Sequence, residues 1–415
     1  MIDIKKKEDC VGCNACVQRC PKSCISMIED EQGFLYPKVD LNKCIDCHLC
    51  EKACPVINQE ESRKPLHTYA AKNNNAEVQE TSSSGGVFFA LVEYVIKEKQ
   101  GVVFGARFND KWEVVHDYAE TIKDAEAFKG SKYVQSRIDD NFKKAEDFLK
   151  SGRTVLFSGT PCQIAGLRLF LRKDYENQLI CVDIICHGVP SPMVWRDYLK
   201  YLSSLYDADF GNIPDFQTAK NLKSNSITGI TFRDKHISWE NYGFSVQSVC
   251  QTNQNSDLVQ IRNCNEENEL LYESHNSNIY MQGFLKDLYL RPSCYACPAK
   301  CGKSNADITL GDFWGIKNVL KDFYMRNGVS LVCINTTKGE SLFFSAIKEY
   351  STVNFDDCLK YNPALIISSS IPKQYHKFWD LYPQKGIGCI KSIVRKSKPG
   401  LIRKIWRKFQ TIFNF

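Results

Sequence analysis

Two cysteine runs of the same form near the N-terminus constrain this chain more than any other feature. Each run reads C-x2-C-x2-C-x3-C-P and ends at Pro21 or at Pro55. The runs are Cys10, Cys13, Cys16, Cys20 and Cys44, Cys47, Cys50, Cys54. In this spacing three thiolates bind one cubane and the fourth crosses to the second cubane. The pattern predicts an α+β ferredoxin-type domain with two [4Fe–4S] clusters, and hence a chain that moves electrons.

The crossing of the fourth cysteine assigns ligands to each cluster. One set is Cys10, Cys13, Cys16 and Cys54, and the other is Cys44, Cys47, Cys50 and Cys20. A pair of zinc knuckles is the alternative, but zinc sites usually combine two separated C-x2-C pairs. Two tetrads that each end in Cys-Pro fit zinc poorly. Cys24 lies outside the pattern, and we expect it to pack as a small apolar side chain beneath a cluster.

The composition fits a globular metalloprotein of 415 residues. The N-terminus lacks the apolar segment of a signal peptide and no apolar run reaches about 18 residues, so we expect a cytoplasmic chain without a transmembrane helix. In a reducing compartment, 20 cysteines indicate metal ligation rather than disulfides. The net charge of +6 comes from the C-terminal end, where nine Lys or Arg and no acidic residue follow Asp380.

Strand-like and helix-like segments alternate after the cysteine runs, which predicts an α/β domain. Strands are expected at 67–72, 102–108, 112–118, 154–158, 179–186 and 329–335. Helices are expected at 87–97, 141–150, 162–172, 193–205 and 341–350. The expected division is a cluster domain (1–58), a linker (59–66), an α/β domain (67–380) and a basic tail (381–415). A polar segment, 206–265, has strand-like pieces at 227–232 and 243–249 and should be an insertion.

Further cysteines stand where an α/β fold gathers ligands. Cys294, Cys297 and Cys301 are close in sequence, whereas Cys162 follows one expected buried strand and Cys186 ends another. Ligands collect at the carboxyl ends of strands in such sheets, so the topology allows a cluster held by Cys162, Cys186, Cys294 and Cys297. In the alternative, the two single cysteines are buried thiols and the C-x2-C pair binds zinc. Spacing alone leaves both interpretations open.

Five motifs follow one another through the second domain. They are Ser-Ser-Ser-Gly-Gly (82–86), Lys-Gly-Ser-Lys-Tyr-Val (129–134), Gly-Thr-Pro-Cys-Gln (159–163), Cys-His-Gly (186–188), and Cys-Tyr-Ala-Cys (294–297) leading to Ala-Asp-Ile-Thr-Leu-Gly-Asp-Phe-Trp-Gly (306–315). Their order resembles the coenzyme F420 hydrogenase/dehydrogenase beta-subunit family. The resemblance implies bound FAD and a third [4Fe–4S] cluster held by the C-x2-C pair and strand-end cysteines. Cys301 is additional to the family pattern, so the fourth ligand stays open between Cys162, Cys186 and Cys301.

The resemblance also implies flavin-binding residues in the first three motifs. Ser83, Ser84, Gly85 and Gly86 precede an expected helix, and free N–H groups at a helix N-terminus suit the FAD pyrophosphate. The other candidates are Lys129, Gly130, Ser131, Lys132, Tyr133, Gly159, Thr160, Pro161 and Gln163. The two lysines would hold phosphate or the electron-rich edge of reduced flavin, and Gly159 allows close backbone approach. The alternatives are ordinary caps and turns, and two solvated lysines.

Three other features carry further expectations. His187 beside Cys186 is a candidate catalytic donor near the flavin, although a lone histidine at a strand end is more often structural. Asp307 and Asp312 bracket a short expected strand and would either orient the cluster lobe or form a cap and a turn. Residues 401–413 place Trp, Phe and Ile on one helical face and Lys and Arg on the other. This predicts an amphipathic helix on an anionic membrane surface or docked on protein, and no nucleic-acid binding.

These features indicate an iron–sulfur flavoprotein oxidoreductase. FAD would exchange two electrons with a small substrate, and the clusters would carry single electrons to or from a redox partner protein, reduced ferredoxin, a nicotinamide or F420. Bacterial proteins that resemble this chain are associated with polysaccharide biosynthesis, so the resemblance implies a role there. The alternative is an electron-transfer subunit without its own substrate, docked on a separate catalytic protein.

Overall fold

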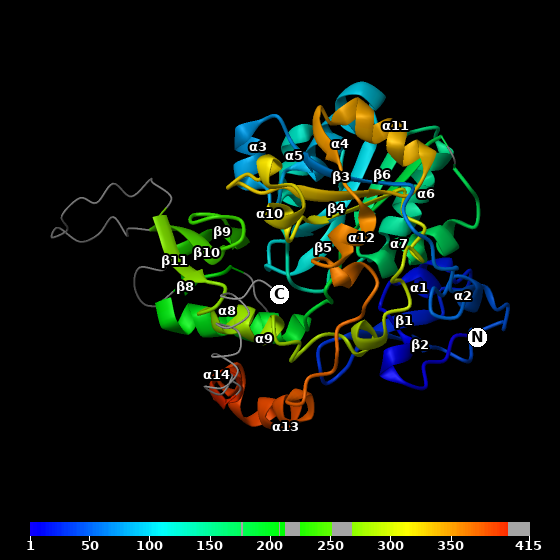
Figure 1. Cartoon of the computed structure of the whole chain (residues 1–415). Helices are drawn as coiled ribbons and strands as arrows, with labels where there is room; N and C mark the ends of the chain where they lie inside the picture. The colour runs from blue at the N-terminus through cyan, green and yellow to red at the C-terminus, as the bar shows by residue number, and fades with distance from the viewer. Residues whose placement is uncertain (176, 207, 212–224, 251–267, 397–415) are drawn as a thin grey trace, which may run out of the picture.

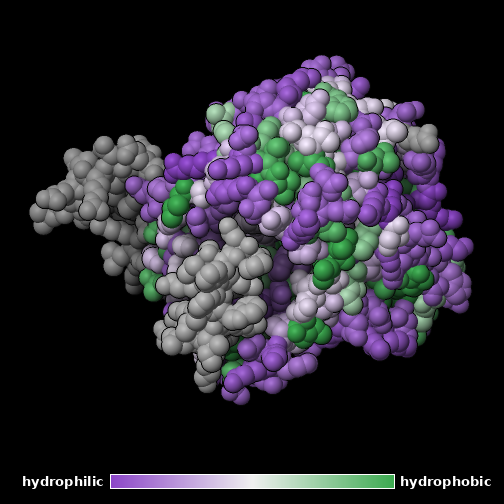
Figure 2. Space-filling view, viewed as in Figure 1, coloured by the Kyte–Doolittle hydropathy of each residue, from purple (hydrophilic) through white to green (hydrophobic). Residues whose placement is uncertain are grey.

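The computed structural model describes residues 1–175, 177–206, 208–211, 225–250 and 268–396. The cysteine-rich N-terminal segment lies at one end of a large sheet, and a smaller sheet with its own helices lies on the other side (Figure 1). The described residues form sheets of eight, four and two strands. On the face seen in Figure 2, hydrophilic residues predominate and hydrophobic ones occur in separate spots.

The N-terminal segment contains one antiparallel strand pair and short helices. These elements are η1 (Lys7–Asp9), α1 (Ala15–Arg19), β1 (Ile25–Glu29), β2 (Leu35–Val39) and α2 (Leu49–Lys52). Both α-helices begin directly after left-handed residues, Asn14 and His48, which follow the second cysteine of each run. The repeated motif therefore repeats as structure, with one short helix for each cysteine run.

The eight-stranded sheet of the described residues has a parallel centre and antiparallel edges. Its order is β14-β3-β13-β12-β7-β6-β4-β5, and β12, β7, β6 and β4 are parallel neighbours. The bounds are β3 (His67–Lys72), β4 (Val102–Phe108), β5 (Val114–Ala119), β6 (Val155–Gly159), β7 (Leu179–Ile184), β12 (Ile308–Asp312), β13 (Ser330–Ile334) and β14 (Glu349–Thr352). Buried strands of this kind need helices on both faces of the sheet.

Helices cover the two faces because successive strand residues point in opposite directions. Val103 packs with α4 and α11, whereas Val102 and Phe104 pack with α6, α7 and the N-terminal segment. The helices around this sheet are α3 (Ala76–Thr81), α4 (Val87–Lys99), α5 (Ile122–Ala125), α6 (Asn141–Lys150), α7 (Pro161–Leu171), α10 (Ile316–Val319), α11 (Thr337–Ala346) and α12 (Phe355–Leu359). The N-terminal segment is thus part of one face of the α/β core.

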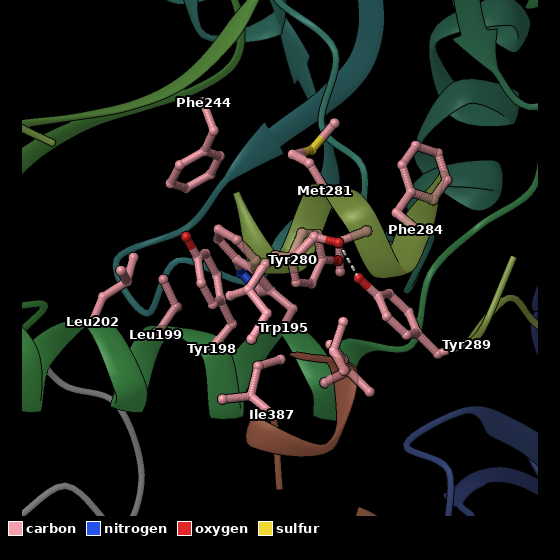
Figure 3. Close-up of a cluster of buried hydrophobic side chains, with 14 of the residues drawn as sticks. Trp195, Tyr198, Leu199, Leu202, Phe244, Tyr280, Met281, Phe284, Tyr289 and Ile387 are labelled. Atoms are coloured by element: carbon pink, nitrogen blue, oxygen red, sulfur yellow. Dashed lines mark hydrogen bonds between the residues drawn. The ribbon is translucent and has the colours of Figure 1, made fainter. Parts of the chain in front are cut away.

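A second core lies under the smaller sheet. Its strands are β8 (Ala208–Asp209), β9 (Asn225–Asp234), β10 (Gly243–Cys250) and β11 (Asn268–Ser274), and its helices are α8 (Pro192–Tyr206), α9 (Ile279–Phe284), α13 (Tyr375–Lys385) and α14 (Gly388–Lys396). Trp195, Tyr198 and Tyr280 meet in its centre, where the Tyr289 hydroxyl donates to the Tyr280 carbonyl (Figure 3). This core positions β9, whose side chains reach the first candidate flavin motif.

Most expected elements occur within a few residues of their predicted bounds, with two local corrections. The helix expected at 341–350 is instead α11, and β14 follows it, so Glu349 and Tyr350 are strand residues. The strand expected at 179–186 ends at Ile184, which leaves Cys186 in the loop beyond it.

The segments expected as an insertion and a tail also have described parts. The smaller sheet continues beyond residue 265 to Ser274. The first part of the basic tail, through α14, packs into the second core. The amphipathic segment 401–413 lies outside the described residues. None of the helices in the described part of the chain has the length and hydropathy needed to cross a lipid bilayer.

Candidate functional site

Two cavities in the N-terminal segment are lined by the two expected ligand sets. The inner cavity is lined by Cys10, Cys13, Cys16 and Cys54 together with mostly apolar residues. The outer cavity is lined by Cys20, Cys44, Cys47 and Cys50. Each cavity therefore joins three cysteines of one run to the fourth of the other, as the crossed pattern requires.

The backbone around the second cysteine of each run is wound in the same way. Gly12 and Asn14 flank Cys13 with φ values of 70° and 65°, and Asp46 and His48 flank Cys47 with 49° and 57°. Alternation with left-handed residues turns backbone N–H groups toward one side and forms a concave site for anions. A cluster bound by thiolates carries negative charge, so this winding suits it.

Cys24 is buried, as expected, and it also reaches a candidate ligand. Its Sγ lies 3.3 Å from the Sγ of Cys20, and both side chains line the outer cavity. The outer cavity therefore contains one thiol more than a cluster requires.

The four cysteines expected to form the third group converge. Cys162 is the second residue of α7, Cys186 follows β7, and Cys294 and Cys297 lie in and after η3 (Pro292–Ala296). Burial, together with the charges of Cys297 and Cys186, raises the pKa of the Cys162 thiol to about 12. Burial likewise raises the pKa of Cys294, with contributions from Cys186, Cys162 and Cys297. These thiols are near enough to repel one another as thiolates.

Cys301 has different contacts from the four converging cysteines. It has a left-handed φ of 60°, and its Sγ is 3.5 Å from the carbonyl oxygen of Ile366, to which it donates. The buried Lys300 donates to the carbonyl of Cys186 at 2.6 Å and fixes the loop after β7. The geometry thus favours Cys162 and Cys186 over Cys301 as partners of the C-x2-C pair.

The described residues contain no group of three or more His, Cys, Asp or Glu side chains placed to hold a single metal ion. A cubane is bound differently, because each thiolate binds its own iron and the four cysteines surround the cluster.

The inner cavity and the third cysteine group meet at α7. Gly166 lies one helical turn after Cys162, and a Cβ there would come within 2.9 Å of the Cys13 Sγ. Glycine therefore allows the first cysteine run to pack directly on α7, the helix that contains Cys162. The expected linker is also anchored here, because Arg63 donates to the carbonyls of Gly302 (3.1 Å) and Ala306 (2.9 Å).

Asp307 ties the third group to the sheet. Its carboxylate is 1% exposed and accepts hydrogen bonds from Arg168 Nη2 (3.0 Å), Cys181 N (2.8 Å) and Thr336 Oγ1 (2.8 Å). Since Arg168 is on α7 and Cys181 on β7, this carboxylate joins the two elements that present Cys162 and Cys186.

The first two candidate flavin motifs touch. The backbone N of Ser131 donates to the Ser83 Oγ at 2.6 Å. Ser84 Oγ donates to the Val329 carbonyl at 3.0 Å, and the N of Gly85 donates to Ser330 Oγ at 3.1 Å. Gly86 is the N-cap of α4 with φ 78°. The turn is therefore held against β13, and only part of its hydrogen-bonding capacity is left for a ligand.

Neither lysine of the second motif is solvated. Lys129 pairs with Glu126 at 2.6 Å, and its Nζ lies 4.0 Å from the Phe89 ring centre. Lys132 Nζ donates to the carbonyls of Lys129 (2.7 Å) and Gly130 (3.1 Å), and burial lowers its pKa to about 7. The described hydrogen bonds of the Lys132 amine are thus to neutral carbonyl oxygens.

Gly130 and Tyr133 of the second motif have different surroundings. Gly130 has φ 78°, and a Cβ there would meet nothing within 4 Å. The carbonyl of Tyr133 accepts from the Tyr280 hydroxyl at 2.7 Å, and its ring packs on Phe284. Tyr133 therefore links the motif to the second core.

The third motif forms a helix cap. Thr160 and Gln163 make a capping box at the start of α7, with Pro161 as its first residue. Gln163 Nε2 also donates to Ser136 Oγ at 2.9 Å. Gly159 ends β6 directly beside Gln163. These residues position Cys162, which matches the cap alternative more closely than direct contact with a ring.

Sequence reasoning missed two cations next to the first motif. Arg233, on β9, pairs with Asp312 at 2.9 Å, donates to the Ser83 carbonyl at 3.4 Å and lies 3.9 Å from the Tyr242 ring centre. Lys235 donates to the carbonyls of Ser84 (3.2 Å), Gln79 and Asn327, and burial lowers its pKa to about 8. They belong to the expected insertion, and no motif there marked them.

His187 is exposed and pairs with Asp287 at 2.5 Å. Its own carbonyl accepts from Ser369 Oγ at 2.5 Å. This contact holds the loop that carries Cys186, which is the structural alternative for this histidine.

The cysteine-lined cavities are those of a ferredoxin-like domain with two [4Fe–4S] sites. Residues 9–58 match the model of the 4Fe-4S dicluster domain, and residues 152–357 match that of the C terminus of the coenzyme F420 hydrogenase/dehydrogenase beta subunit. The chain belongs to this beta-subunit family, with a dicluster ferredoxin-like domain in front of the family's C-terminal domain.

The curated relatives are short or partial matches. A polyferredoxin-like protein of Methanocaldococcus jannaschii is 32% identical over 69 residues, which are 15% of this chain and 41% of that protein. The 7Fe ferredoxin of Hydrogenibacillus schlegelii is 45% identical over 51 residues, 12% of this chain and 59% of the ferredoxin. The chain therefore spans about half the length of these relatives.

One solved structure that matches the chain is that of the F420-reducing [NiFe] hydrogenase complex from Methanosarcina barkeri. The match covers 82% of this chain and 95% of the other, with 14% identity and a TM-score of 0.42. A TM-score of this size does not by itself establish a shared fold.

Proposed function

We propose that this chain is an iron–sulfur flavoprotein oxidoreductase that passes electrons between [4Fe–4S] clusters and FAD. The observation that carries the proposal is the convergence of Cys162, Cys186, Cys294 and Cys297 beside the inner cavity. These four side chains would hold a third cluster between the dicluster domain and the candidate flavin motifs. Bound clusters of this kind exchange single electrons, whereas a bound flavin exchanges one or two.

Positive charge around the turn at 82–86 supports the flavin part. Arg233 and Lys235 both donate to carbonyls of the turn, and Lys132 lies in the loop that contacts Ser83. Asp312 neutralises Arg233, while the described contacts of Lys235 and Lys132 are to neutral carbonyl oxygens. A pyrophosphate would supply the missing negative charge. Open space beside Gly130 leaves room for such a group.

The proposal also includes electron donors and acceptors, which reduction assays can test. Electrons would come from, or go to, a redox partner protein, reduced ferredoxin, a nicotinamide or F420. On the basis of the family resemblance in the sequence, the proposed substrates are intermediates of polysaccharide biosynthesis. The basic segment 399–415 would attach the chain to an anionic membrane surface, and its deletion should abolish cosedimentation with anionic vesicles.

The testing experiment is purification without oxygen, followed by flavin quantification and reduction assays with NADH, NADPH, reduced ferredoxin and F420. We expect about one FAD per chain, bleached by one of these donors in a chain with intact clusters. A flavin-free chain that takes up electrons into its clusters would contradict the flavin part. It would then be an electron-transfer subunit that docks on a separate catalytic protein, as the family's description as a subunit allows.

A further inference from the structure

Arg291 is a buried cation at the junction between the inner cavity and the third cysteine group. Its side chain is 1% exposed, and it precedes Cys294 by three residues. Its Nε donates to the carbonyl of Cys10 at 2.7 Å, and its Nη2 lies 3.5 Å from the Cys10 Sγ. One guanidinium thus contacts a candidate ligand of the inner cavity and stands in the segment that carries a candidate ligand of the third group.

The other partners of Arg291 are neutral. Its Nη2 donates to the Leu35 carbonyl at 2.9 Å, and its Nη1 donates to Gln135 Oε1 at 3.0 Å. Its Cζ lies 4.4 Å from the ring centre of Tyr36 and 5.4 Å from that of Phe34. Among the ion pairs of the described residues, none involves Arg291, although a buried charge without a counter-ion is costly.

Among the residues that line the inner cavity, only the cysteine ligands can supply negative charge to balance Arg291. Apart from its cysteines, the cavity is lined by residues without ionisable side chains, such as Ile2, Val11 and Met27. A cluster bound by four thiolates is an anion, and it gains one more negative charge on reduction. A fixed positive charge at hydrogen-bond distance from a ligating sulfur therefore stabilises the reduced cluster more than the oxidised one.

We propose that Arg291 is a positioning residue that raises the reduction potential of the cluster held by Cys10, Cys13, Cys16 and Cys54. This inference rests on the proposed ligand sets. Burial of a cluster disfavours the additional charge of the reduced state, and the inner cavity is more buried than the outer one, where Cys47 is exposed. Arg291 offsets this penalty on the inner side. With both clusters bound, Arg291 would favour transfer of one electron from the outer to the inner cluster, a step that makes or breaks no bond.

The segment that carries Arg291 also leads to the third group, because Arg291 precedes Cys294 by three residues. Cys13 of the inner set packs against Gly166, one helical turn after Cys162. These two features connect the inner set of cysteines to the third group. The electron route would therefore run from the outer cluster through the inner cluster to the third group.

The test is a redox titration of the full-length chain, purified without oxygen and followed by electron paramagnetic resonance. The inner signal is assigned as the one lost in Cys16→Ser. In Arg291→Gln we expect the reduction equilibrium of the inner cluster to weaken at least tenfold, which is about 59 mV for one electron. The outer cluster in the same molecule is the internal control and should not shift. Arg291→Lys keeps the charge and should restore most of the potential.

A second variant covers the case in which Arg291→Gln loses the inner cluster. Gln135→Glu places a carboxylate on Nη1 of the retained arginine and should lower the inner potential in the same direction by a smaller factor. An unchanged inner potential in both variants would overturn the inference. So would loss of the inner iron in Arg291→Gln with no shift in Gln135→Glu, because that result assigns Arg291 a structural role. Absence of iron from the wild-type chain would instead contradict the ligand sets themselves.

Discussion

The N-terminal cysteine sets and the third cysteine group use the same side chain in opposite ways. The N-terminal sets come from two short runs whose backbone winding repeats around Cys13 and Cys47. The third group is assembled from the start of α7, the loop after β7 and the η3 segment. The first arrangement depends on local spacing, and the second depends on a correctly folded sheet. The two should therefore respond differently to the same kind of mutation.

The largest expected effect separates the third group from the N-terminal sets. Cys162→Ser should remove about four iron atoms from about twelve per chain, because each [4Fe–4S] cluster contains four. Iron analysis and the visible spectrum check the change, and the N-terminal signals should stay. Cys301→Ser is the matched control and should keep all of its iron, since its Sγ contacts the Ile366 carbonyl. Equal iron loss in both variants would break the assignment of Cys162.

A weaker sheet should disturb the third group first. Asp307→Asn removes a buried charge paired with Arg168 and should cost about 3 kcal/mol of unfolding free energy. In urea titrations without oxygen, the third cluster should then be lost at a lower urea concentration than the N-terminal clusters. Asp356→Asn, at an exposed pair with Lys64, is the control and should change stability little. Simultaneous loss of all clusters would show that the two regions do not differ in this respect.

The affinity for FAD should depend on residues of the smaller sheet and of the segment that follows β9. Lys235→Gln removes the cation that contacts the Ser84 carbonyl, and a lost charged hydrogen bond of about 1.5–3 kcal/mol weakens FAD binding about 10- to 100-fold. Equilibrium dialysis of FAD measures the change, with iron content as the check on folding. Arg326→Gln, whose exposed side chain donates to the Ile237 carbonyl, is the control and should bind FAD normally. Normal FAD binding by Lys235→Gln would remove Lys235, which directly follows β9, from the site.

The smallest expected effect is a pH dependence of FAD affinity. Burial lowers the pKa of Lys132 to about 7, so the ligand-free chain loses this charge as the pH rises through 7. A bound pyrophosphate favours the charged form and raises that pKa. Affinity should therefore be constant below pH 7 and fall by up to about tenfold per unit above it. Lys132→Met should bind more weakly with a flatter profile, and an unchanged profile would show that Lys132 does not face the flavin.

Local patterns were sufficient for one region and insufficient for the other. The spacing of Cys10 to Cys54 predicted the cavity linings, because the ligands follow one another along the chain. Strand-end position predicted the meeting of Cys162 with Cys186, because parallel strands share an edge. Lys235 and Arg291 act through contacts between residues more than 90 positions apart, which leave no local signal. The antiparallel edge strands likewise depend on pairing partners far along the chain.

The iron content of the full-length chain, purified and kept without oxygen, tests the central claim most directly. The account predicts about twelve iron atoms per chain, four for each of three [4Fe–4S] clusters. About eight iron atoms, with Cys162→Ser indistinguishable from wild type, would contradict it, because the third cysteine group would then hold no cluster.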